Sequence, residues 1–80
     1  MLFEIQNQDN DGDWHTVKPI NIVSRKQMNL WTQMVAIAGQ YCRRGVPTRI
    51  LQWVSIAGQK HDINIWENGE WKVNPMSILI

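Results

Sequence analysis

The stretch that decides the fold is residues 24–45, SRKQMNLWTQMVAIAGQYCRRG. Ser24 and Gln27 have the spacing of a capping box, in which each side chain satisfies a backbone N–H at the start of a helix. Arg43 and Arg44 precede Gly45, as is typical of a helix C-terminus, where cations face the negative end of the dipole and glycine takes a positive φ. The stretch therefore predicts one helix from Ser24 to about Arg44.

Apolar side chains recur along one face of this helix at intervals of three and four residues. They are Met28, Trp31, Met34, Val35, Ala38, Tyr41 and Cys42, and Leu30 and Ile37 widen the face. So wide a face predicts that a sheet covers one part of it and that something else covers the rest.

Two strands joined by a hairpin are predicted before the helix. Residues 2–6 alternate, with Phe3 and Ile5 on one face. Residues 9–13, DNDGD, are rich in turn formers, and Asp11-Gly12 is expected to supply the positive-φ positions of a tight hairpin. Residues 14–17 are the returning strand, which Pro19 is expected to end because proline lacks a donor for the ladder.

The chain after the helix is predicted to form two further hairpin-linked strands and a short third one. Residues 48–56 are rich in β-branched and aromatic residues and apolar on both faces, which indicates a central strand. Residues 57–60 form a turn. Residues 62–67 and 70–73 flank Asn68-Gly69, a strong hairpin signal that places Trp66 opposite Trp71. Pro75 is expected to end the last strand, and the apolar tail, residues 77–80, packs back or adds an edge strand.

The order β-β-α-β-β-β predicts an α+β fold, with a single antiparallel sheet of four to five strands and one helix packed on one face. Eighty residues are expected to make one two-layer domain, 1–80. The predicted core consists of Phe3, Ile5, Trp31, Val35, Ala38, Ile50 and Val54.

Composition narrows the function classes. A net charge of +1 gives no global field toward nucleic acid. The single cysteine, Cys42, excludes an internal disulfide and a cysteine-built zinc site. With no recognisable signal peptide and no apolar run long enough to cross a membrane, the sequence predicts a cytoplasmic protein without a membrane partner.

No group of residues predicts catalysis. The acidic residues 9–13 lack the spacing of a calcium loop, so they are expected to form a solvated turn, with weak cation binding left open. His15 and His61 are interpreted as surface histidines. Cys42 points into the core by its helical phase. We therefore expect no enzyme, no catalytic residue, no cofactor and no metal site.

Arginine and tryptophan are the residue types that suggest binding, because both are enriched at interface hot spots. Arg43, Arg44 and Arg49 surround the helix-to-strand junction, and Arg49 should share a strand face with Trp53. A single helix leaves one sheet face open, so some of the five tryptophans should be exposed. The predicted binding residues are Arg43, Arg44, Arg49, Trp53, Trp66 and Trp71. The alternatives are that the arginines only complement the helix dipole and that the tryptophans fill a core or a dimer interface.

The layout resembles small phage and prophage accessory proteins. It shares their N-terminal hairpin with a Gly-Trp-like turn (here Gly12-Asp13-Trp14), their capped helix and their Pro-x-Arg strand (here Pro47-Thr48-Arg49). Some proteins of this kind inhibit host defence complexes, anti-CRISPR proteins among them. The resemblance implies a binding protein without catalysis.

The function expected from the sequence is a non-enzymatic protein–protein interaction module, a phage-type inhibitor or adaptor whose partner is a host protein complex. Its contact surface would be the open sheet face together with the arginine corner. Two alternatives stay open: a nucleic-acid-binding domain that uses the same arginine and tryptophan residues, and a self-associating structural protein such as a homodimer.

Overall fold

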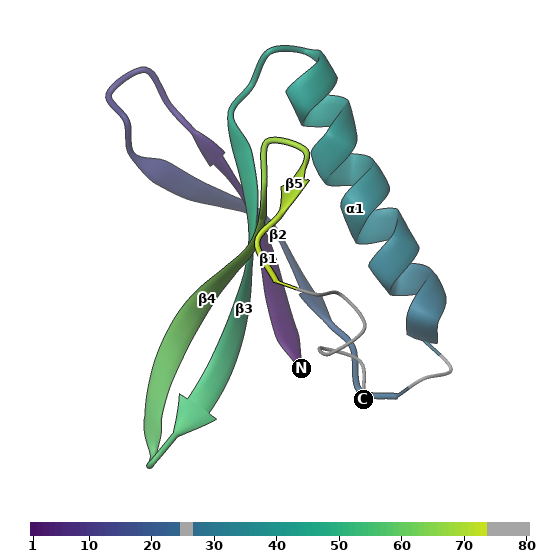
Figure 1. Ribbon diagram of the computed structural model, residues 1–80, viewed down its shortest axis with the longest axis vertical. Coiled ribbons are helices and arrows are strands. Elements are labelled where there is room, and N and C mark those ends of the chain that lie inside the picture. The colour runs from purple at the N-terminus through teal and green to yellow at the C-terminus, as the bar shows by residue number, and fades with distance from the viewer. Residues whose placement is uncertain (25–26, 74–80) are drawn as a thin grey trace.

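The computed structural model describes residues 1–24 and 27–73 and confirms the predicted α+β fold. Its elements are β1 (Leu2–Gln8), β2 (Trp14–Asn21), α1 (Met28–Arg43), β3 (Thr48–Ile56), β4 (Gln59–Glu67) and β5 (Glu70–Trp71). The strands form one antiparallel sheet in the order β2-β1-β3-β4-β5, and α1 packs on one face of it (Figure 1). In the described part of the chain, no helix combines the length and the apolarity that a membrane span requires.

The C-terminus of α1 confirms the prediction for Gly45. This residue has a φ of 82°, its N–H donates to the carbonyl of Cys42, and the N–H of Val46 donates to that of Tyr41. The two bonds make a Schellman motif, which satisfies carbonyls that the helix end leaves free.

The start of α1 differs from the prediction. The helix begins at Met28 and not at Ser24, and its N-terminus has no side-chain cap. The Gln27 side chain accepts the N–H of Val23, one residue before the donor that a capping box would use, while the Gln27 N–H donates to the Ser24 carbonyl. These bonds close a turn ahead of the helix, so the capping-box prediction is wrong.

The first hairpin also differs from the prediction in two details. Pro19 does not end β2 but pairs with Glu4 inside it. Because β2 is an edge strand, a residue without an N–H donor can be accommodated there. In the preceding turn only Gly12 has a positive φ, 88°, and Asp11 does not. The N–H of Gly12 donates to the Asp9 carbonyl and the N–H of Asp9 to the Asp13 carbonyl, so the loop is longer than the predicted two-residue turn.

The second and third hairpins have two-residue turns. Ala57 and Gly58 both have positive φ, so β4 begins at Gln59 and the turn is two residues shorter than predicted. Asn68 and Gly69 have φ values of 50° and 92°, both positive as in a type I′ turn, which confirms the predicted hairpin. Trp66 pairs with Trp71 in the register, which confirms the predicted cross-strand pair. The predictions for Pro75 and for residues 77–80 lie outside the described residues.

The core lies between α1 and the sheet. Its buried members are Phe3, Ile5, Ile20, Ile22, Trp31, Met34, Ala38, Ile50, Ile65 and Trp66, with Val35 partly buried against them. Of the predicted core residues, Val54 is absent from this cluster. It is half-buried near the distal end of β3, past Trp53, the last β3 residue that pairs with β1. The prediction for Val54 was wrong because strand periodicity does not show where the covering helix stops.

Candidate functional site

Strand alternation gives the sheet a second face, opposite to α1, which we call the open face. Phe3, Ile5 and Ile50 belong to the helix-covered core. Their neighbours in β1 and β3 therefore point the other way, and the register pairs them on the open face as Leu2 with Trp53, Glu4 with Leu51 and Gln6 with Arg49. Figure 1 shows that among the described elements only strands border this side of the molecule.

Arg49 makes two side-chain contacts on the open face. Its guanidinium carbon lies 4.3 Å from the ring centroid of Trp14, a cation–π contact that joins β3 to β2. Its Nε donates to Oε1 of Gln6 at 2.8 Å. Both contacts act on the same planar group and orient it within this chain.

Gln6 extends this contact into a polar network across β1. Its Nε2 lies 3.2 Å from Oγ1 of Thr16 and 3.3 Å from Oε2 of Glu4, and Thr16 donates to the same carboxylate oxygen. Gln6 itself is buried. The network therefore holds a row of polar side chains against the sheet, with Arg49 at one end and Glu4 at the other.

A hollow lies beside this network, at the end of the open face where β1 and β3 meet. It has a volume of about 460 Å³ and is lined by Leu2, Glu4, Trp53, Val54, Ser55 and Lys60. Leu51, the register partner of Glu4 on this face, is 3% exposed. The hollow thus combines an apolar lining with one carboxylate and one ammonium group.

The charges of the open face nearly cancel. The register adds the side chains of β4 to this face: Lys60 opposite Ser55, Asp62 opposite Trp53 and Glu67 opposite Arg49. Glu70, which pairs with Glu67, and Lys72, whose ammonium lies 3.5 Å from the Glu70 carboxylate, extend this face past β4. Three basic side chains therefore share the face with four carboxylates, those of Glu4, Asp62, Glu67 and Glu70. Such a surface has no excess of positive charge for phosphates.

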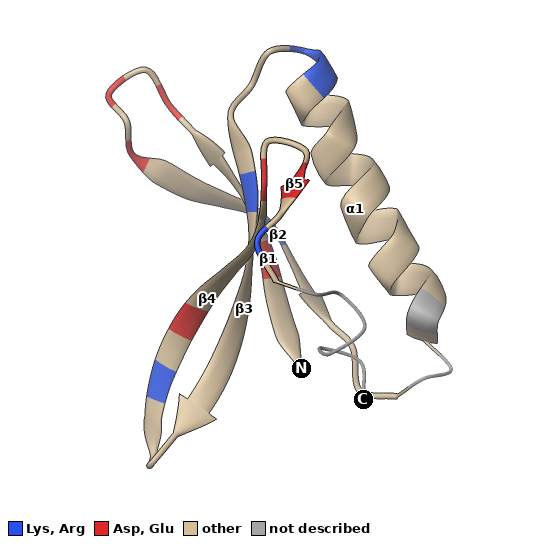
Figure 2. Ribbon diagram, in the orientation of Figure 1, with Lys and Arg blue, Asp and Glu red and all other residues tan. Residues whose placement is uncertain are grey.

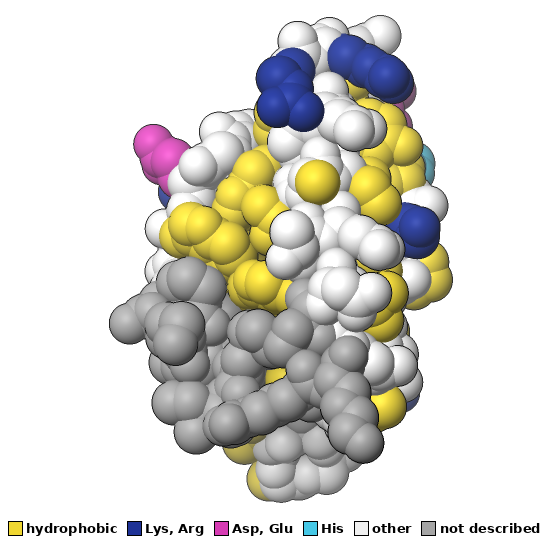
Figure 3. Space-filling model, turned by 90° about the vertical axis from the view of Figure 1, so that its right-hand side faces the viewer, with side chains coloured by type: hydrophobic (Ala, Val, Ile, Leu, Met, Phe, Trp, Pro, Cys, Tyr) yellow, Lys and Arg dark blue, Asp and Glu magenta, His cyan; other side chains and the backbone are white. Residues whose placement is uncertain are grey.

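The structure does not gather the predicted arginine corner on one surface. Arg43 and Arg44 are exposed at the C-terminal end of α1, whereas Arg49 stacks on Trp14 on the opposite side of the sheet. Figure 2 shows the basic end of α1 well apart from the basic residue of β3, and Figure 3 shows basic side chains gathered at one end of the helix side. Sequence proximity therefore placed together three arginines that the fold divides between two surfaces.

The tryptophans are divided in the same way. Trp53 lies on the open face as predicted, together with Trp14. Trp66 is 4% exposed in the core and so offers no contact surface. Trp71 is 38% exposed and stacks on Trp31 with a centroid distance of 5.3 Å, at the edge of a second hollow on the helix side. Trp14 was missing from the predicted set because its contact with Arg49 depends on the pairing of β1 with both β2 and β3.

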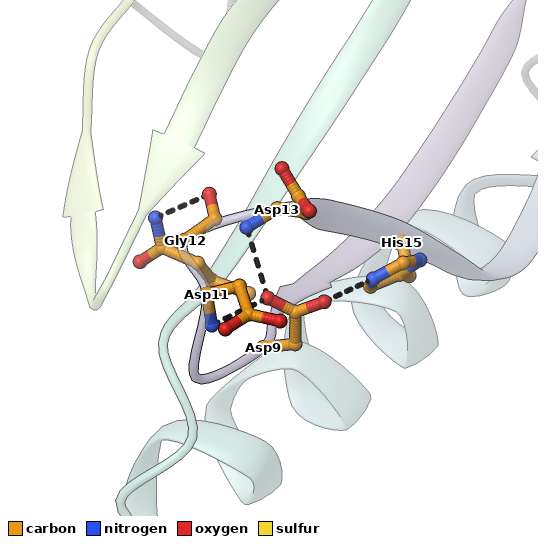
Figure 4. Close-up of polar contacts among 6 residues, drawn as sticks. Asp9, Asp11, Gly12, Asp13 and His15 are labelled. Atoms are coloured by element: carbon orange, nitrogen blue, oxygen red, sulfur yellow. Dashed lines mark hydrogen bonds and ion pairs between the residues drawn. The ribbon is translucent and has the colours of Figure 1, made fainter.

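The Asp9 carboxylate makes hydrogen bonds within the acidic turn of the first hairpin (Figure 4). Oδ1 of Asp9 accepts the N–H groups of Asp11 and Asp13, and Oδ2 contacts Nε2 of His15. The His15 contact is the main cause that lowers the pKa of Asp9, and the two amides add to it. Within residues 1–24 and 27–73 no three side chains form a group that could hold a metal ion.

Comparison of the chain with protein-family models, with curated proteins and with solved structures finds no match.

Proposed function

We propose that this protein is a non-enzymatic protein–protein interaction module that binds its partner through the open face. The observation that carries the proposal is the cation–π stack of Arg49 on Trp14, on the same face as Trp53 and not covered by α1. Tryptophan and arginine are the residues most enriched at interface hot spots, and a side chain fixed before binding loses less entropy when the partner docks.

The hollow at the Glu4 end of the polar network suggests the chemistry of the partner. Leu2, Trp53 and Val54 offer an apolar lining, while Glu4 and Lys60 stand at the same hollow with opposite charges. An apolar side chain of a partner polypeptide fits such a lining, and its flanking peptide groups can donate to Glu4 and accept from Lys60. The proposed partner is therefore a protein that inserts an apolar side chain into this hollow and contacts the Arg49–Trp14 stack on the same face.

The charge balance favours a protein over nucleic acid. Arg49 on Trp14 could hold a phosphate or stack on a base, but Asp62 and Glu67 share that face and would repel a phosphate backbone. The test is the salt dependence of binding, because phosphate contacts make affinity fall steeply with salt. The role of a phage-type inhibitor or adaptor of a host complex stays a prediction of the resemblance.

Capture from a lysate by matched variants tests the proposal. Trp53→Ala removes an open-face aromatic, and Arg43→Glu/Arg44→Glu reverses the charge of the helix end, whose residues are exposed. We expect Trp53→Ala to weaken capture of the partner about tenfold or more, as a hot-spot residue does, and the helix-end variant to capture as the parent does. Melting curves of both variants show whether each is folded.

A photo-crosslinking amino acid identifies the contact directly. Placed at Ser55, which lines the hollow, it should form a covalent adduct with the partner, whereas at Thr32, exposed on α1, it should not. Equal capture by parent and Trp53→Ala, with adducts formed only from Thr32, would move the interface to the helix side. Loss of capture in the helix-end variant alone would restore Arg43 and Arg44 as the site.

A further inference from the structure

Among the described residues, nothing pairs with the outer edge of β4 over much of its length. β5 is two residues long and pairs only Trp66 with Trp71 and Glu67 with Glu70, after which the Lys72 N–H donates to the Ile65 carbonyl. Over residues 59–64 no described strand pairs with β4 on this side, and Figure 1 shows the β3–β4 hairpin extending beyond β5. An unpaired strand edge is a template for a further strand.

The turn geometry shows which backbone groups this edge offers. Ala57 and Gly58 have φ values of 53° and 80°, and they join Ile56 to its register partner Gln59. In a two-residue turn of this kind the flanking residues bond to each other, so the N–H and C=O of Gln59 face β3. Alternation then directs the N–H and C=O of Lys60, Asp62 and Asn64 outward.

The side chains along the same edge are self-complementary in charge. Lys60 is opposite Ser55 and Asp62 opposite Trp53, so both side chains project on the open face, two residues apart. They are of opposite sign, and both residues are exposed. An antiparallel strand carrying the same sequence can therefore place a carboxylate against the ammonium and an ammonium against the carboxylate.

We propose that β4 pairs with β4 of a second copy of this chain, antiparallel and about a two-fold axis at His61. Lys60 of each copy then faces Asp62 of the other, and the outward N–H and C=O groups of these residues bond across the interface. The contact is isologous, as two-fold symmetry requires. It joins two five-stranded sheets into one sheet of ten strands, with both helices on one side and both open faces on the other.

Other registers of the same pairing are disfavoured by the residues present. A shift of one residue would bring side chains of opposite faces against each other. An axis at Asp62 would put two carboxylates in contact, and an axis at Lys60 would put two ammonium groups in contact. An axis at Ile63 would oppose Lys60 and Trp66, whose outer edge already pairs with Trp71. The register with its axis at His61 opposes no like charges and does not involve the β4 residues that already pair with β5.

One partly exposed apolar side chain would lie at this interface. Ile63, 37% exposed, lies on the face of the sheet opposite to Asp62, where it would be opposite Gln59 of the second copy.

Because only one short strand segment from each copy takes part, the interface is smaller than that of a stable complex. The expected dimer is therefore weak, reversible and dependent on concentration.

A charge swap between two variants tests this proposal, which does not depend on the open-face partner. Lys60→Asp makes residues 60 and 62 both acidic, and Asp62→Lys makes both basic. The association constant for dimerisation of each variant alone should then be roughly a tenth of that of the parent, or lower, because like charges face each other across the axis. An equimolar mixture should form a heterodimer, since every acidic side chain then faces a basic one. Sedimentation equilibrium over a concentration series measures all four samples.

Amide hydrogen exchange locates the contact. The amides of Lys60 and Asp62 should become protected as the parent concentration rises, while the amides of Thr16 and Lys18 on the other edge strand should not change. Both substituted positions are exposed, so both variants should melt as the parent does. A parent that stays monomeric throughout the series, single variants that dimerise like the parent, or a mixture that stays monomeric would each overturn the proposal.

Discussion

The covered face and the open face of the sheet are built from alternate residues of the same strands, yet their side chains are fixed by different means. On the covered face Phe3 and Ile50 are fully buried against α1, and Trp31 meets the Phe3 ring edge-to-face at 5.4 Å. On the open face hydrogen bonds and one cation–π contact orient Glu4, Gln6 and Arg49, and no described element forms a second layer above them.

The two faces therefore support different properties of the protein. Burial of apolar area between two layers supplies most of the folding free energy, so the covered face should dominate stability. The open face contributes few apolar side chains to the core and presents the stacked side chains of arginine and tryptophan to the surface. Substitutions on the two faces should therefore separate loss of stability from loss of binding, and the predictions below test that separation.

Trp31→Ala should give the largest loss of stability. Trp31 is 9% exposed, contacts Phe3 and stacks on Trp71, so its removal leaves a cavity between the layers. A large-to-small change of this kind costs about 3–5 kcal/mol, which approaches the whole stability of a small domain. The measurement is the urea midpoint of unfolding, with Trp53→Ala on the open face as the matched control. If the two tryptophan variants lost equal stability, the contrast between the faces would not hold.

The sequence predicted those parts of the fold that depend on local signals. Gly45 and Asn68-Gly69 each need a positive φ, which neighbouring residues alone make evident, and the bounds of β3 follow from its β-branched run. The helix start was misjudged by four residues because the Ser24–Gln27 spacing has two uses, a capping box and the turn that is observed.

The candidate site was harder to predict because it depends on contacts between distant strands. The Arg49–Trp14 stack requires β1 to pair on one side with β2 and on the other with β3. No local pattern specifies that order. Arg44 and Arg49 are five residues apart in the chain. Arg44 follows the end of α1, whereas the side chain of Arg49 projects from the sheet face opposite to α1.

Arg49→Lys should have a moderate effect that separates the two properties. Lysine keeps the positive charge but loses the planar stack on Trp14 and the Nε donor to Gln6. We expect a loss of about 0.5–1 kcal/mol in the free energy of unfolding. Partner capture should fall by a larger factor. Arg43→Lys is the matched control at the helix end, where both measurements should stay at the parent values. Unchanged capture by Arg49→Lys would remove the stack from the interface.

The smallest effect on stability is expected for a substitution in the first hairpin turn, which lies outside both faces of the sheet. The contact with His15 and the amides of Asp13 and Asp11 hold the pKa of Asp9 below its ordinary value in the folded protein. As the pH falls, the unfolded chain therefore takes up this proton first. The stabilisation from Asp9 is present above about pH 4 and is lost as the pH drops through the lowered folded pKa.

Asp9→Asn tests this small contribution. Asparagine can still accept the N–H groups of Asp11 and Asp13 but cannot carry the charge that faces His15. The melting temperature of the parent should exceed that of the variant slightly at neutral pH, and the difference should shrink toward zero in strong acid. Asp11→Asn is the control, because in the described residues no hydrogen bond involves the Asp11 carboxylate. A difference that grows with acid would reverse the sign of the linkage, and one as large as that of Trp31→Ala would mean that this turn, and not the covered face alone, holds the fold together.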